Sequence, residues 1–100
     1  MIKVKVNYDN QNISSIEISG HAGYSKNGSD IVCASVSSIA ITTVNAILKF
    51  DNQALIYHEA DGYLDIKLMK HDKYIDNLIS NMLDLLKELE KKYPKYINLK

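Results

Sequence analysis

Apolar and polar residues alternate along the first segment of the chain, IKVKVNY at positions 2–8. A period of two is typical of a strand that buries one face. Polar residues Asp9–Asn12 then predict a turn, and a second alternating segment runs from about Ile13 to Ser19 and stops at Gly20. The chain is therefore expected to open with a β-hairpin.

A run of eighteen residues without charge follows, from Ile31 to Leu48. Its apolar residues recur at helical spacing and predict a helix over about Ile31–Phe50. Asp30, directly before the run, is a favoured N-cap residue. A run of this length raises the question of a membrane span. Six of its residues are polar: Ser35, Ser37, Ser38, Thr42, Thr43 and Asn45. These favour a buried helix, and no membrane contact is expected.

The second half of the chain repeats the order of the first. Alternation predicts a strand over Ala54–Glu59, a turn at Ala60-Asp61-Gly62 and a strand over Leu64–Leu68. Apolar residues at steps of three and four over Ile75–Leu89 then predict an amphipathic helix.

This second helix should end near Tyr93, because Pro94 cannot continue it. Tyr96–Leu99 is long enough for one closing strand. The expected fold class is α+β, with two layers in the order strand-strand-helix-strand-strand-helix-strand and two helices on a mixed or antiparallel sheet. Residues 1–100 are expected to form a single domain.

Composition narrows the function. Apolar residues make up 46% of the sequence and charged residues 24%, which is typical of a globular protein. Twelve basic and twelve acidic residues give a net charge of zero, which disfavours direct nucleic-acid binding. The single cysteine cannot form an intramolecular disulfide, and the first residues lack the apolar core of a signal peptide. A cytoplasmic location is expected.

Candidate chemistry lies in GHAGYSKNGSDIVCAS, at positions 20–35. If Asp30 caps the helix, Cys33 lies in its first turn, where unpaired N–H groups and the helix dipole favour a thiolate. The same N–H groups could stabilise an oxyanion. His21 directly follows the second predicted strand, twelve positions before Cys33, and could act as its general base.

Two neighbouring residues could support this pair. Asp30 could orient the imidazole of His21, and Ser37 lies four residues after Cys33, on the same helix face. On spacing alone, the alternatives are more common: a small buried thiol, a helix cap and a hydroxyl bonded to its own helix.

A second class of function is an RNA-binding module. Gly20–Gly23 has the GXXG pattern of the KH backbone clamp, which suggests a non-enzymatic, ribosome-associated protein. That clamp joins two helices, whereas this segment follows a predicted strand. No P-loop motif is present, and the cysteine and histidines lack the paired spacing of metal ligands, so neither cofactor nor metal is expected. His58 and His71 are given no role.

The residues Gly20-His21-Ala22, the glycine-bearing loop, the segment Ser29–Ala34 (SDIVCA) and Ser37 resemble the bacterial ribosomal-processing cysteine proteases of the Prp family. The resemblance implies a cysteine endopeptidase that removes the short N-terminal extension of the large-subunit ribosomal protein numbered twenty-seven. The family cuts after a pair of aromatic residues. The catalytic dyad falls on His21 and Cys33, with Asp30 and Ser37 in supporting roles.

The resemblance also implies a homodimer, which would explain the wide apolar face of the first helix. The loop Ala22–Ser29 is expected to act as a mobile lid, since Gly23 and Gly28 permit unusual backbone angles. Lys26-Asn27 departs from the acidic or histidine residues that relatives often carry there.

Overall fold

The seven predicted elements are present, in the predicted order. The computed structural model describes the backbone at residues 1–20 and 27–100, and side chains at 1–20 and 31–100. The elements are β1 (Ile2–Asp9), β2 (Asn12–Ser19), α1 (Asn27–Phe50), β3 (Leu55–Ala60), β4 (Tyr63–Leu68), α2 (Lys73–Lys92) and β5 (Ile97–Leu99). The α+β prediction is confirmed.

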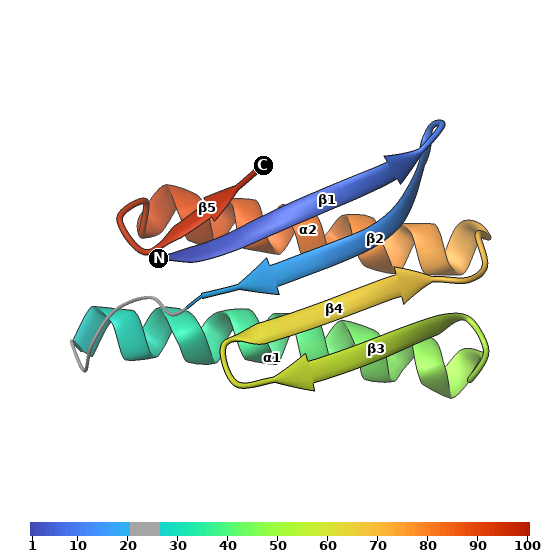
Figure 1. Cartoon of the computed structure of the whole chain (residues 1–100), viewed down its shortest axis with the longest axis horizontal. Helices are drawn as coiled ribbons and strands as arrows, with labels where there is room; N and C mark the ends of the chain where they lie inside the picture. Colours follow the sequence, from blue (N-terminus) through green and yellow to red (C-terminus); the bar gives the residue numbers. More distant parts are fainter. Residues whose placement is uncertain (21–26) are drawn as a thin grey trace.

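The five strands form one mixed sheet in the order β3-β4-β2-β1-β5. All neighbouring pairs are antiparallel except β1 and β5, which run parallel with Ile2 opposite Ile97. Both helices lie on the same face of the sheet, α1 behind β3 and β4 and α2 behind β1 and β2 (Figure 1). None of the described helices lies on the opposite face.

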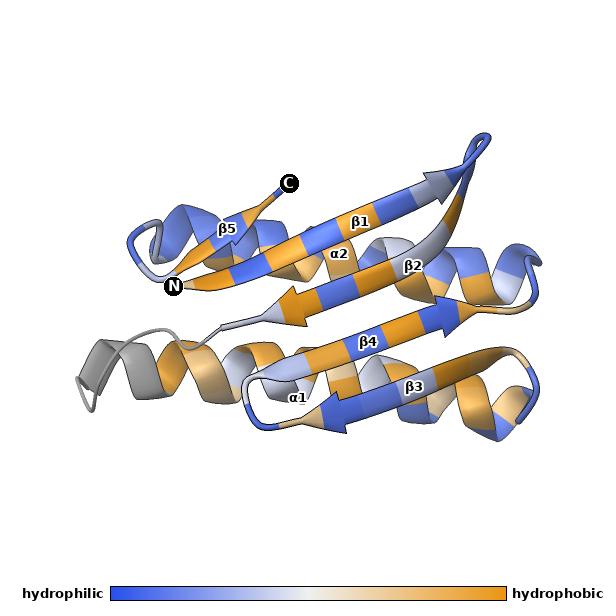
Figure 2. Ribbon diagram, in the orientation of Figure 1, coloured by the Kyte–Doolittle hydropathy of each residue, from blue (hydrophilic) through white to orange (hydrophobic). Residues whose placement is uncertain are grey.

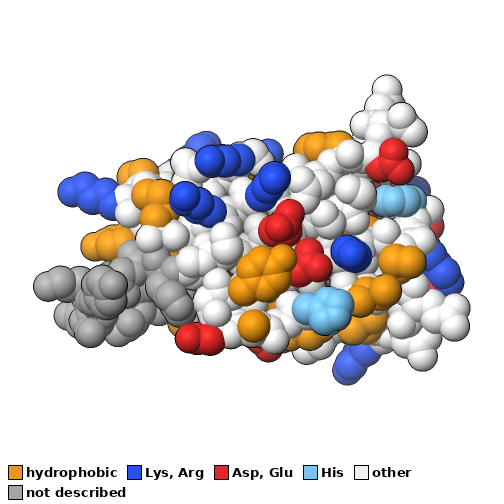
Figure 3. Space-filling view, viewed as in Figure 1, with side chains coloured by type: hydrophobic (Ala, Val, Ile, Leu, Met, Phe, Trp, Pro, Cys, Tyr) orange, Lys and Arg blue, Asp and Glu red, His pale blue; other side chains and the backbone are white. Residues whose placement is uncertain are grey.

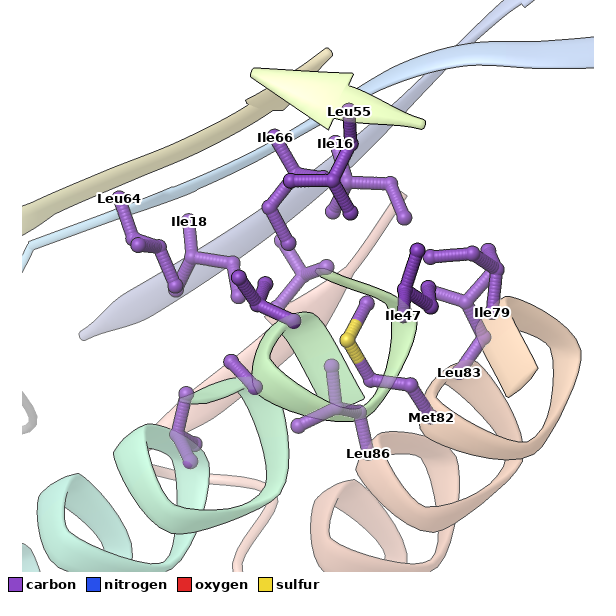
Figure 4. Close-up of a cluster of buried hydrophobic side chains, with 14 of the residues drawn as sticks. Ile16, Ile18, Ile47, Leu55, Leu64, Ile66, Ile79, Met82, Leu83 and Leu86 are labelled. Atoms are coloured by element: carbon purple, nitrogen blue, oxygen red, sulfur yellow. The ribbon is translucent and has the colours of Figure 1, made fainter. Parts of the chain in front are cut away.

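The core lies between the inner face of the sheet and the two helices. Hydrophobic and hydrophilic residues alternate along β1, β2 and β4 (Figure 2), and successive side chains of a strand point to opposite faces of the sheet. Ile16 and Ile66 are paired across β2 and β4 and are both fully buried. They meet side chains of both helices, including Ile47 of α1 and Met82 of α2 (Figure 4).

Two of the polar residues of α1 form hydrogen bonds within the helix. The hydroxyl of Ser35 donates to the carbonyl of Ile31 at 2.8 Å, and that of Thr43 to the carbonyl of Ile39 at 2.9 Å. Such bonds satisfy hydroxyl groups without charged partners. By length and composition the stretch Ile31–Phe50 could cross a membrane, yet its inward side chains form part of the core on the sheet.

Helix α2 begins and ends at defined residues. Asp72 is its N-cap, and the side chain accepts a hydrogen bond from the backbone N–H of Ile75 at 2.9 Å. At the other end the N–H of Tyr93 donates to the carbonyl of Leu89 at 2.9 Å, directly before Pro94. The predicted stop at Tyr93 is confirmed.

Two adjacent leucines of α2 provide a test of this core. Leu86 is 0% exposed and Leu85 is 39% exposed. We expect Leu86→Ala to lower the free energy of unfolding by about 2–5 kcal/mol, because it leaves a cavity against α1 and the sheet. The matched variant Leu85→Ala should cost less than about 1 kcal/mol. Chemical denaturation measures both, and equal losses would contradict the packing described.

Candidate active site

A cleft of about 460 Å³ lies between the first half of α1, the end of β2 and the β3–β4 turn. Its apolar lining comes from strand ends and from α1: Ile2, Ile18, Val36, Ile41 and Leu64. The other lining residues in the described part of the chain are Gly20, Cys33 and Ser37 of α1, and residues 59–63. The cleft is therefore mostly apolar inside and polar on the side of the turn.

Cys33 and Ser37 lie on the same wall of this cleft. Cys33 is half-buried and packs against the core, while Ser37, one turn further along α1, is exposed. The prediction that the two residues share a helix face is confirmed. Cys33 is partly buried and is among the residues that line the cleft, so it is not fully enclosed in the core.

The expected start of the first helix is wrong by one turn. α1 begins at Asn27, so Asp30 is the fourth helical residue and not the N-cap. Polar residues such as Asn, Ser and Asp are favourable both at the cap and in the first turn, so the sequence pattern did not distinguish the two registers. Gly28 consequently lies within the helix and not in the preceding loop.

This shift also changes the chemistry expected at Cys33. As the seventh residue of α1, Cys33 lies beyond the first turn, where N–H groups already bond to carbonyls four residues earlier. The unpaired N–H groups of the helix start therefore do not surround the thiol. The expectation that Cys33 lies in the first turn is wrong, and the proposed oxyanion hole and thiolate stabilisation by first-turn amides rested on it.

Some of the predicted site residues lie outside the part of the chain that the structure describes. His21 and Gly23 fall outside the described residues, as does the side chain of Asp30. His58 is exposed in β3, and His71 precedes α2, where its Nδ1 is 3.5 Å from Asp76. Neither lines the cleft, and within the described residues no group of three or more metal-binding side chains occurs.

Gly20 fixes the point at which the chain leaves β2 for His21. Its φ is +92°, and a Cβ placed there would collide with the carbonyl oxygen of Met1. Its N–H donates to the carbonyl of Gly62 in the β3–β4 turn at 2.8 Å. The strand end is thus attached to the turn at the edge of the cleft.

The polar side of the cleft includes two carboxylates that sequence reasoning missed, Glu59 and Asp61. The hydroxyl of Tyr57 donates to Oε1 of Glu59 at 2.9 Å. Partial burial, followed by the hydrogen bond and charge of Glu59, raises the pKa of Tyr57 above its ordinary value. The phenol therefore stays protonated and remains a donor at neutral pH.

Comparison with known proteins identifies the class. The sequence is 29% identical over 101 residues to the "Ribosomal processing cysteine protease Prp" of Staphylococcus aureus strain Mu50, covering 98% of this chain and 94% of that protein. The same values hold for the protein of strain NCTC 8325. The relatives are thus bacterial cysteine peptidases that act in ribosomal processing.

Solved structures agree with this class. The S. aureus protease in complex with a covalently linked product peptide has a TM-score of 0.87 at 27% identity, covering 99% of this chain and 97% of that one. Its substrate-peptide complex has a TM-score of 0.90 at 25% identity, covering 100% and 98%. SMU.848 from Streptococcus mutans has a TM-score of 0.85 at 30% identity, covering 100% and 92%.

The fold, the cleft beside Cys33 and these relatives define a cysteine peptidase. The family model described as "Cysteine protease Prp" matches residues 1–98, and the chain belongs to this family. Membership favours the peptidase over the RNA clamp. In addition, the GXXG segment begins directly after strand β2, unlike the helix–helix loop of a KH domain.

Gly20 offers a test of the cleft's geometry. We expect Gly20→Ala to destabilise the fold by about 1–3 kcal/mol, because alanine is strained at this positive φ and meets the backbone of Met1. The neighbouring change Ser19→Ala should cost less than about 1 kcal/mol. Thermal or chemical unfolding measures both, and a Gly20→Ala protein as stable as the starting chain would contradict the description.

Proposed function

We propose that this protein removes the N-terminal extension of the large-subunit ribosomal protein numbered twenty-seven, with Cys33 as nucleophile and His21 as general base. The observation that carries the proposal is the position of the Cys33 thiol in the cleft whose edge is formed by Gly20. His21 directly follows Gly20 in the sequence, and Gly20 lines the cleft.

In the first half of the reaction, Sγ of Cys33 attacks the carbonyl carbon of the scissile peptide bond while His21 accepts the thiol proton. The tetrahedral intermediate collapses when His21 returns that proton to the leaving nitrogen. The C–N bond breaks, the new amino terminus departs, and an acyl-thioester remains on Cys33. Water, deprotonated by His21, then hydrolyses the thioester and restores the thiol.

The lining of the cleft suits the proposed substrate. Its apolar side chains Ile18, Val36, Ile41 and Leu64 form a surface on which aromatic rings can be buried. A volume of about 460 Å³ is within the range of pockets that hold small ligands or a few side chains. Cleavage after a pair of aromatic residues is consistent with this shape.

Ser37 and Asp30 take supporting roles in the proposal. Ser37 lies on the cleft wall one turn after Cys33, where its hydroxyl can donate to a substrate carbonyl. Asp30 is not the N-cap of α1 and comes one helical turn before Cys33. In the proposal its carboxylate orients the imidazole of His21.

The expected homodimer and cytoplasmic location belong to the same proposal. Between Ile31 and Leu48, α1 carries no charged residue, and Ile31 itself is 54% exposed. An uncharged and partly exposed helix face is typical of a surface that a second copy covers.

Cleavage of the extended ribosomal protein tests the nucleophile and the base. We expect Cys33→Ala and His21→Ala each to lower kcat by at least about a thousandfold, because both groups act in one step. His58→Ala, a histidine exposed in β3, is the matched control and should retain full activity. Product formation is followed by mass spectrometry. Activity in Cys33→Ala equal to that of the starting chain would refute the proposal.

Assembly is tested separately. Sedimentation or light scattering at micromolar concentration is expected to give twice the chain mass of 11.3 kDa. Thr42→Lys, which places a charge on the exposed side of α1, should shift the protein toward the monomer. Lys87→Glu on α2 is the control that should leave the mass unchanged. A monomer throughout this range would contradict the dimer.

A further inference from the structure

The two carboxylates at the cleft have no positive partner among the described residues. Within that part of the chain, the salt bridges are Lys70 with Asp51 and His71 with Asp76. Glu59 accepts a hydrogen bond from Tyr57 and forms no ion pair with a described lysine. The described cleft lining contains Glu59 and Asp61 and no lysine or arginine.

One face of the molecule shows where charged side chains lie relative to the β3–β4 turn. In the space-filling view, an acidic side chain lies beside the grey residues, at the end where the β3–β4 turn lies (Figure 3). Lysine side chains on the same face gather over β1 and β5. At the cleft itself, the described lining is acidic, with Glu59 and Asp61 and no lysine or arginine.

Glu59 is also held in place. The bond from Tyr57 joins two side chains of the same strand, two residues apart, and the ring of Tyr57 packs against the core. A carboxylate that is already oriented loses less conformational entropy when it binds a cation. Asp61, in the turn next to Gly62, adds a second negative charge to the same wall.

Resting on the proposed function, we infer that Glu59 and Asp61 form a subsite that binds a lysine or arginine side chain of the peptide substrate. The aliphatic part of such a side chain can lie on Leu64 at the floor of the cleft while its charged end reaches Glu59. The apolar lining beside the thiol would then bind the substrate residues at the scissile bond. The β3–β4 turn would favour a positively charged substrate residue next to them.

The experiment uses pairs of peptides that span the cleavage site of the extended ribosomal protein. The two peptides of a pair differ at one position, which is lysine in one and glutamine in the other. Pairs are made for each position from four residues before the cut to four after it, so that the position that contacts the subsite is located. For one position, we expect the lysine peptide to have a KM about two- to fivefold lower than the glutamine peptide, with kcat unchanged. The preference should shrink as salt is raised.

Variants of the wall assign the effect to its residues. Glu59→Gln should abolish most of the preference, Asp61→Asn should reduce it, and Tyr57→Phe should weaken it by releasing the Glu59 side chain. Glu88→Gln, the same change on the exposed face of α2, is the matched control and should keep the preference. A preference that survives in the double variant Glu59→Gln/Asp61→Asn overturns the inference, and so does equal cleavage of every peptide pair.

A binding measurement separates this inference from the proposed function. The Cys33→Ala protein is titrated with the same labelled peptides, and Kd is read from fluorescence anisotropy. If the unsubstituted protein cleaves no peptide, the proposed activity is refuted. The preference for lysine over glutamine is still measured from the Kd values. Tighter binding of a lysine peptide, lost with Glu59→Gln, supports the subsite, and equal Kd values for all peptide pairs overturn it.

Discussion

The structure depends on burial of a single face of the sheet. Because both helices pack on the inner face, their apolar sides must meet the strands and each other at once, and the core forms where these three surfaces converge. A cleft remains between α1, the end of β2 and the turn from β3 to β4. At that end, apolar side chains such as Ile18 and Leu64 line a cleft and not a closed interior.

The fold was predictable because its determinants are local. Alternation over 2–8 and a helical period over 75–89 each specify an element without reference to the rest of the chain, and all seven elements were found. The start of α1 was not predictable in this way. Asn27, Ser29 and Asp30 are all suitable first-turn or cap residues, so local preference gives several registers of similar free energy.

In the site too, residues that are close in sequence could be predicted and residues that are distant in sequence could not. Gly20, Cys33 and Ser37 are close in sequence, and a motif that contains them can be recognised along the chain. Glu59 and Asp61 reach the cleft only because β4 pairs with β2, which puts Tyr63 opposite Ser19. Alternation predicts that β3 and β4 exist but not which strand they join, so the carboxylates could not be placed beside Cys33 from the sequence.

The hydrogen bond between Gly20 and Gly62 has a consequence for inhibitors and for divergence among relatives. It holds the β3–β4 turn beside the strand end, while the exposed side chains of that turn contribute nothing to the core. Apart from Gly62, whose φ is +69°, substitutions in that turn are therefore expected to cost little stability, and this wall can vary without loss of the fold. A compound that binds only the thiol and the apolar floor would act broadly, whereas one that also reaches the turn would discriminate between species.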